Sequence, residues 1–212
     1  MDYRSVLLDV DGTLVDSNDA HAHAWVEILA KYGHEVSYGR VRRMIGMGGD
    51  RLIEEAAGIP RGSKENERIG EARSELFREK WLGRVRPMLG ARTLVLHLQR
   101  RGCELAIASA AKAEELEPLL EIADVKDLVE RRTTSSDVEE SKPAPDIVEA
   151  ALAKISGERS RAVMVGDTPY DLRAARDAGI AMIGVTCGGW AAEAFSGAVG
   201  VFRDPADLAL RW

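Results

Sequence analysis

Short apolar runs alternate with helical segments along this chain. Each run is followed by small or acidic residues and then by a stretch with helical periodicity. Short apolar runs bounded by turn residues are typical of strands buried on both faces, and strands that alternate with helices indicate a parallel sheet. The runs are residues 6–8, 105–108, 162–165 and 181–185. The pattern predicts the α/β class, with ligand groups at the carboxyl ends of the strands.

Three of the intervening helices have clear ends in the sequence. Residues 91–101 carry apolar side chains at helical spacing and stop at Gly102. Residues 146–154 follow Pro145, and residues 171–178 close on a glycine. Proline suits a first helical turn and glycine suits the position after the last one.

One long stretch, residues 16–87, breaks the alternation because it has helical periodicity and no convincing strand. Asn18 or Asp19 is the expected cap of a helix that runs to Tyr32, and Ser63 is the expected cap of another that runs through Phe77 to Trp81. The glycine-rich residues 45–50 between them are an expected flexible corner. We therefore expect a core formed by residues 1–15 and 88–212, with an all-helical insert at 16–87.

Composition narrows the class of protein. The chain has 212 residues, 45% of them hydrophobic, and a formal net charge of −6. A core of this size needs neither disulfides nor structural zinc, and its two cysteines match no zinc-binding spacing. The acidic balance argues against nucleic acid as a partner. Since there is no apolar run of membrane-spanning length and no secretory signal, we expect a soluble, cytoplasmic protein.

Paired carboxylates follow the first predicted strand. Asp9 and Asp11 are costly at the end of a buried strand unless a cation or a reaction uses them. An EF-hand calcium loop is excluded, because Leu14 and Ala20 stand where that loop needs glycine and glutamate. Asp167 occupies the same position after another buried strand. Parallel neighbouring strands would bring Asp9 and Asp167 to one edge, where carboxylate oxygens suit Mg²⁺.

Three further residues have ambiguous meanings on their own. Asp171 is either a second acid of the same site or simply a helix N-cap. Ser109 ends a third strand and is either an anion contact or a turn residue. Lys142 lies in a proline-rich turn and, as an isolated lysine, would be solvated.

In chain order, Asp9 with Asp11, Ser109, Lys142 and Asp167 with its neighbours resemble the four motifs of the haloacid dehalogenase-like hydrolase superfamily. The resemblance covers nearly the whole chain. It implies a Rossmann-like, doubly wound parallel sheet with a mobile cap. The insert is similar to the helical cap of the branch that includes phosphoglycolate phosphatase and β-phosphoglucomutase.

The resemblance also implies a reaction, the Mg²⁺-dependent hydrolysis of a small-molecule phosphate ester. Asp9 would attack phosphorus and form an aspartyl-phosphate, and Asp11 would act as general acid and then base. Mg²⁺ would be held by Asp9, the main-chain carbonyl of Asp11, and Asp167. Lys142 and Ser109 would stabilise the phosphoryl oxygens. So would main-chain amides near Asp11, including that of Gly12, and near Ala110.

Two other functions remain as alternatives. His21 resembles a histidine on the first cap helix of β-phosphoglucomutase, although it suits an ordinary cap-helix position equally well. Gly48 and Gly49 stand where the mutase carries an arginine for a second phosphate, and Gly166, followed five residues later by Asp171, is the phosphatase arrangement. These departures favour a phosphatase over a phosphomutase. A non-catalytic module that binds phosphorylated ligands or a partner protein is disfavoured, because only catalysis needs both Asp9 and Asp11.

The predicted insert carries a basic stretch that has two interpretations. Its arginines are Arg40, Arg42, Arg43 and Arg51. They form a solvated face, or one or two of them, with Arg43 a candidate, reach a carboxylate or second anion of the substrate. Gly48 would let the backbone approach that ligand. We expect a monomer or a homodimer whose cap closes about hinges at residues 14–17 and 85–89.

Overall fold

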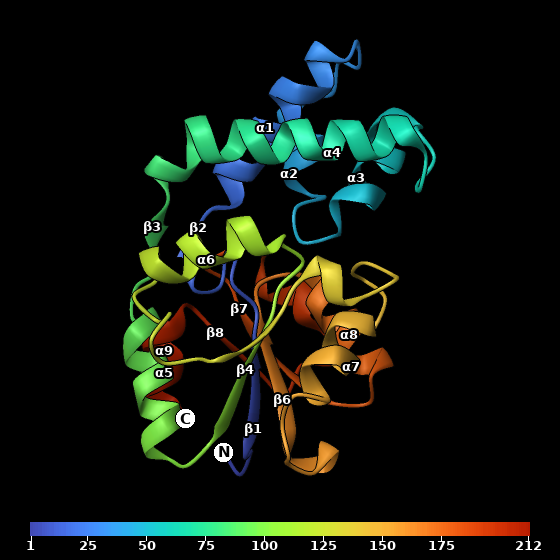
Figure 1. Ribbon diagram of the computed structural model, residues 1–212. Helices are drawn as coiled ribbons and strands as arrows, with labels where there is room; N and C mark the ends of the chain where they lie inside the picture. The colour runs from blue at the N-terminus through green and yellow to red at the C-terminus, as the bar shows by residue number, and fades with distance from the viewer.

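A six-stranded parallel sheet forms the centre of the molecule in the computed structural model, which describes residues 1–212 (Figure 1). The order across the sheet is β5-β4-β1-β6-β7-β8. The strands are β1 (Ser5–Leu8), β4 (Glu104–Ala108), β5 (Arg131–Thr133), β6 (Ala162–Gly166), β7 (Ala181–Val185) and β8 (Gly200–Phe202). In the register, Leu8 of β1 pairs with Ile107 of β4 on one side and Val165 of β6 on the other. These three strands therefore end at the same edge.

Helices cover both faces of this sheet, so the predicted α/β class and doubly wound core are confirmed. The core helices are α5 (Ala91–Arg100), α6 (Ala113–Ile122), α7 (Asp146–Leu152), α8 (Pro169–Asp177) and α9 (Pro205–Arg211). Val6 and Leu8 of β1 pack in the cluster that contains apolar residues of α5, α6 and α9, whereas Leu7 packs with those of α7 and α8. Successive strand residues point to opposite faces, and each fully buried aliphatic side chain contributes roughly 1.5–3 kcal/mol.

A second body of helices lies beyond the carboxyl ends of the strands, above α6 in Figure 1. It contains α1 (Asn18–Lys31), α2 (Tyr38–Arg42), α3 (Gly49–Ala57) and α4 (Lys64–Leu76), and α4 continues into the π-helical turn η1 (Phe77–Trp81) and the 3₁₀ turn η2 (Leu82–Arg84). These helices have their own apolar cluster, which includes Trp25, Leu52 and Ile69. We call residues 17–85 the cap. Its two long helices agree with the predicted ones, and Ser63 caps α4 by accepting a hydrogen bond from Asn66 N.

Two short strands that the sequence analysis missed join the cap to the core. β2 (Val15–Asp16) and β3 (Arg86–Pro87) form an antiparallel pair. They lie at the two ends of the stretch in which no strand was expected. We propose that this ribbon is the boundary between core and cap, close to the expected hinges.

The other differences from expectation are at the sheet edges. β5 consists of Arg131, Arg132 and Thr133, and β8 begins with a glycine, so neither resembles a buried strand. Edge strands are shorter and tolerate charge because only one side is paired. Residues 133–140 form the expected loop, although Thr133 ends β5 and η3 (Ser135–Asp137) is a 3₁₀ turn. The other 3₁₀ turns of the core are η4 (Arg159–Arg161) and η5 (Ala192–Phe195). None of the helices combines the length and apolar character that crossing a membrane requires.

Candidate active site

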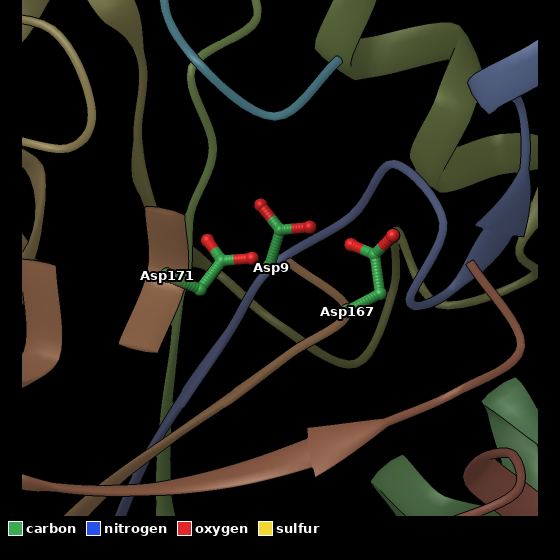
Figure 2. A group of neighbouring side chains, drawn as sticks. All are labelled: Asp9, Asp167 and Asp171. Atoms are coloured by element: carbon green, nitrogen blue, oxygen red, sulfur yellow. The ribbon is translucent and has the colours of Figure 1, made fainter. Parts of the chain in front are cut away.

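Three aspartates meet at the carboxyl edge of the sheet. Asp9 follows β1, Asp167 follows β6, and Asp171 lies in the first turn of α8. One carboxylate oxygen from each residue lies within 4.8 Å of the other two, and all three side chains are buried. Figure 2 shows the three carboxyl groups extending to the same side of the chain. The strand register explains the meeting, because β1 and β6 are neighbours that end together.

Lys142 places its ammonium group between two of these carboxylates. Its Nζ lies 2.7 Å from Asp9 Oδ1 and 2.8 Å from Asp171 Oδ1, and it also donates to Ala108 O at 3.1 Å. Burial alone would lower the pKa of Lys142, but the charges of Asp171 and Asp9 outweigh burial and raise it. The lysine is therefore charged and immobilised beside Asp9, which rules out the solvated interpretation.

Asp171 orients Lys142 and closes the first turn of α8. Its Oδ2 accepts hydrogen bonds from Thr168 N and Thr168 Oγ1, while Thr168 Oγ1 accepts from Asp171 N. This is a capping box in which Thr168 is the N-cap and Asp171 is the third helical residue. The interpretation of Asp171 as the N-cap was therefore wrong. Asp171 therefore holds the lysine beside Asp9, and its carboxylate belongs with those of Asp9 and Asp167 to the group that could hold a metal ion.

The buried charges near Asp9 and Asp167 do not balance. Burial is the main cause that raises the pKa of Asp9, to about 7, and Lys142 only partly opposes it. Burial, and then the negative charges of Asp9 and Asp171, also raise the pKa of Asp167. Three carboxylates face one ammonium, so two negative charges are uncompensated when all are ionised. A divalent cation would supply that balance, and oxygen donors suit Mg²⁺, so the residues present fit the expected ion.

Asn18 and Gly12 pack tightly around Asp167. Asn18 Nδ2 donates to Asp167 Oδ2 at 2.8 Å. Gly12 has a φ of +75°, and a Cβ there would lie 2.2 Å from both Asn18 Nδ2 and Asp167 Oδ2. Glycine is required for the backbone conformation and for this close approach. Asn18, expected only as a helix cap, instead orients the carboxylate.

Asp11 lies apart from the other three carboxylates and has its own partners. Its Oδ1 accepts hydrogen bonds from Ser17 Oγ at 2.5 Å and from His21 Nε2 at 2.8 Å. Burial opposes ionisation, but the imidazole of His21 and the hydrogen bonds from His21 and Ser17 outweigh it and lower the pKa of Asp11. Ser17 is the N-cap residue of α1, yet its hydroxyl bonds to Asp11 rather than to the helix.

The other nitrogen of His21 faces an arginine that the sequence analysis did not single out. Arg73 Nη1, from α4, lies 3.3 Å from His21 Nδ1 and 2.9 Å from Glu115 Oε2 of α6. A guanidinium can only donate, so this contact assigns Nδ1 as the acceptor and Nε2 as the N–H donor to Asp11. Arg73 also stacks over Trp25, and His21 stacks on Phe77 with ring centroids 4.0 Å apart. No sequence motif marked Arg73 or Glu115, because their pairing joins a cap helix to a core helix.

Ser109 and Ala110 follow β4 at the same edge of the sheet as Asp9. Ser109 is fully buried, and its Oγ accepts a hydrogen bond from Ala111 N at 3.1 Å. Ala110 lines both cavities described below. Asp9, Asp11 and Lys142 therefore border one cavity, Asp167 lies beside Asp9, and Ser109 precedes Ala110 of the same lining; the chemical roles of these residues stay predictions.

Two adjoining cavities open between cap and core. The smaller contains Asp9, Asp11 and His21. The larger has a volume of about 360 Å³, within the range of small-molecule sites, and extends between α4 and residues 135–147 of the core. Arg73, Ala110 and Lys142 border both. Gly48 lines the larger cavity, and its N–H donates to Lys142 O at 3.2 Å.

The cap arginines expected near the substrate lie elsewhere. Arg43 is exposed and borders neither cavity, and its carbonyl accepts a hydrogen bond from Tyr170. Arg42 pairs with Asp19, and Arg51 pairs with Glu140. The structure therefore does not bring Arg43 to the site. The cap arginine at the site is Arg73.

Comparisons with known proteins agree with this geometry. The family model described as haloacid dehalogenase-like hydrolase matches residues 6–185. A phosphoglycolate phosphatase of Rhodospirillum rubrum is 29% identical over 215 residues, covering 97% of this chain and 89% of the relative. The fructose-1-phosphate phosphatase YqaB of Escherichia coli is 23% identical over 186 residues, covering 86% and 96%. The crystal structure of a hydrolase from Pseudomonas syringae has a TM-score of 0.90 at 27% identity, covering 98% of this chain and 96% of that one. The chain therefore belongs to the haloacid dehalogenase-like hydrolase family, as an enzyme of its phosphatase type.

Proposed function

We propose that this protein is a Mg²⁺-dependent phosphomonoesterase that acts on small phosphorylated metabolites through an aspartyl-phosphate. The observation that carries the proposal is the separation of the two strand-end aspartates into different environments. Asp9 contacts Lys142 and faces Asp167, whereas Asp11 is bonded to His21 and Ser17. Two carboxyl groups with divergent pKa values suit two chemical roles.

In the first step, an oxygen of Asp9 attacks phosphorus, and the bond from phosphorus to the ester oxygen breaks. The leaving alkoxide takes a proton from Asp11. In the free site Asp11 has a lowered pKa, but the negative charge of a bound phosphoryl group favours the protonated form that this step needs. Lys142 stabilises negative charge on the phosphoryl oxygens.

In the second step, Asp11 takes a proton from water, and the water oxygen attacks phosphorus. The bond between phosphorus and the Asp9 oxygen breaks, which releases inorganic phosphate and restores the Asp9 carboxylate. Mg²⁺ held by Asp9 and Asp167, with the main-chain carbonyl of Asp11, would offset the repulsion between carboxylate and phosphate. His21 keeps Asp11 in position in both steps.

A phosphomutase is the second candidate, and the contact of His21 with Asp11 is the observation in its favour. A mutase must also hold a second phosphate while the first is transferred. The cap arginines that could bind a second phosphate form ion pairs or are exposed outside the cavities. Arg73 already forms an ion pair with Glu115. This favours hydrolysis over transfer between two positions of a sugar.

The test is hydrolysis of p-nitrophenyl phosphate by the wild type and by Asp9→Asn, each with Mg²⁺ and with EDTA. Turnover should require both the metal and Asp9. The surface variant Asp127→Asn is a control, because Asp127 is exposed and pairs only with Arg92. Activity that survives in Asp9→Asn or in EDTA would contradict the proposal. Tight binding of phosphate esters without turnover would instead identify a non-catalytic module, and a product isomer that requires a bisphosphate primer would identify a mutase.

A further inference from the structure

Acidic residues outnumber basic residues in the lining of the larger cavity between cap and core. Phosphate must enter the smaller cavity beside Asp9, so the leaving group of the ester extends into the larger one. Four acidic residues border that larger cavity: Asp50, Glu67, Glu71 and Glu139. Three basic residues border it as well: Arg73, Lys112 and Lys142. Which of these charges are already neutralised decides what the cavity can bind.

Most of the positive charge is used within the protein. Lys142 lies between Asp9 and Asp171, and Arg73 is paired with Glu115. Lys112 is the only basic residue of the lining without an ion pair. A second anionic group on the leaving group would therefore find one free cation, at the core side of the cavity.

The negative charge is mostly uncompensated. Glu67, Glu71 and Glu139 make no hydrogen bond or ion pair through their side chains, whereas Asp50 accepts a hydrogen bond from Ser141 Oγ at 2.7 Å. Glu67 and Glu71 are one turn apart on α4, so they lie on the same face of the helix, above the cavity. Three free carboxylates against one free lysine repel an anion and attract a cation.

The remaining polar lining suits hydroxyl groups. Ser74 is a buried residue of the cavity lining, and its Oγ has no hydrogen-bond partner within the chain. Asn66, Ser135 and Ser141 lie around the same space. A buried hydroxyl without a partner costs free energy that a hydrogen bond from a ligand would recover.

We infer that the leaving group of the physiological ester is a neutral or cationic polyol, such as a sugar or an amino sugar, and that Glu67 and Glu71 select against leaving groups with a second negative charge. The inference rests on the proposed phosphatase function and narrows it. It separates this chain from enzymes whose substrates carry a carboxylate or a second phosphate beside the ester.

The test uses the 6-phosphates of two hexoses and of a hexonic acid, which are similar in size and differ in the charge of the leaving group. They are glucosamine 6-phosphate, which is cationic, glucose 6-phosphate, which is neutral, and 6-phosphogluconate, which is anionic. We expect kcat/KM to fall in that order, by about tenfold from first to last, and to converge at high salt because exposed charges are screened. Inhibition constants against p-nitrophenyl phosphate hydrolysis report the same order where turnover of a sugar phosphate is slow.

The double variant Glu67→Gln/Glu71→Gln should reduce the preference over 6-phosphogluconate to within about twofold. Glu75→Gln is the matched control, since Glu75 lies on the same helix, is exposed and borders neither cavity. It should keep the wild-type order.

The inference is overturned if 6-phosphogluconate equals or exceeds glucose 6-phosphate while p-nitrophenyl phosphate is hydrolysed, or if the double variant and Glu75→Gln behave alike. The proposed function is left standing in both cases. Absence of all hydrolysis, p-nitrophenyl phosphate included, would instead overturn the proposed function and this inference with it.

Discussion

Arg73 of the cap and Glu115 of the core form a nearly buried ion pair, with Nη1 and Oε2 2.9 Å apart. The same guanidinium faces His21, which donates to Asp11. One residue therefore connects contact between cap and core to the orientation of the proposed acid/base. A cap that moved away from α6 would separate Arg73 from Glu115, so the complete arrangement requires the cap to be in place.

The effects of replacing Arg73 and Glu115 on stability should not be additive. Arg73→Met leaves Glu115 as a buried, uncompensated charge, and we expect a loss of about 3 kcal/mol in the free energy of unfolding or a comparable loss of cap closure. Activity should fall about tenfold or more because His21 loses a partner. The double variant Arg73→Met/Glu115→Gln should lose less than the sum of the single variants. Urea unfolding and kcat/KM, measured for the wild type, both single variants and the double variant, complete the double-mutant cycle. Strictly additive effects would show that the two residues are independent.

Removal of His21 should change the ionisation of Asp11. His21→Ala removes the imidazole and one of the hydrogen bonds that lower the pKa of Asp11, so that pKa should rise. Hydrolysis of the aspartyl-phosphate needs Asp11 as a base, so the acid limb of that step should move to higher pH, and kcat should fall about 10- to 100-fold. Carboxyl ¹³C NMR titration measures the pKa directly. His23→Ala is the control on the same helix, since His23 stacks on Trp81 and does not contact Asp11; equal shifts in both variants would exclude the specific role of His21.

The buried carboxylates should make the metal-free protein less stable as pH rises. Burial raises the pKa of Asp9 to about 7 and also raises that of Asp167, so the folded state binds protons more tightly than the unfolded chain. Stability then decreases from about pH 4, the ordinary carboxyl range, to about pH 7, by on the order of 3 kcal/mol. In EDTA the Tm should fall from about pH 5, above which the carboxyl groups of lowered pKa such as Asp11 and Asp207 are already ionised, to about pH 7, and Asp167→Asn should flatten the slope.

Mg²⁺ should oppose this loss, because it binds the ionised carboxylates of the folded state. The increase in Tm on adding Mg²⁺ should therefore be larger at pH 8 than at pH 5, and it should be small in Asp167→Asn. A Tm in EDTA that rises with pH, or a response to Mg²⁺ that is the same at both pH values, would contradict the assigned charge imbalance.

The close approach at Gly12 predicts a steric defect that can be separated from backbone strain. Gly12→Ala introduces a Cβ 2.2 Å from Asn18 Nδ2 and Asp167 Oδ2, in addition to an unfavourable φ of +75°. Gly58 has nearly the same φ, +73°, with no atom near its Cβ position. Gly58→Ala should lose about 1 kcal/mol of stability and keep its activity. Gly12→Ala should lose stability and most Mg²⁺-dependent turnover, measured by thermal unfolding and p-nitrophenyl phosphate hydrolysis. If the two variants behaved alike, backbone strain would explain both and the steric contact at Gly12 would have no effect.

Local sequence patterns determined the central strands, most of the helices and the set of strand-end residues. β1, β4, β6 and β7 are buried on both faces, so their apolar runs are unmistakable, and the positions of Asp9, Ser109 and Asp167 follow from where those strands end. Edge strands carry no such signal, because they are paired on one side only and β5 is mostly charged. The geometry of the strand ends could be expected from parallel pairing alone.

Only the tertiary structure decided which charges meet. Arg43 and Arg73 are both cap arginines, and nothing in their neighbours along the chain shows that the first is exposed while the second pairs with Glu115, 42 residues away. Likewise, Asp171 is indistinguishable in sequence from a helix N-cap until Lys142 lies 2.8 Å from it. Backbone periodicity is a local property that the chain displays residue by residue. Ion pairs between cap and core depend on distances between residues far apart in the chain, and those distances are set only when both parts have folded and packed against each other.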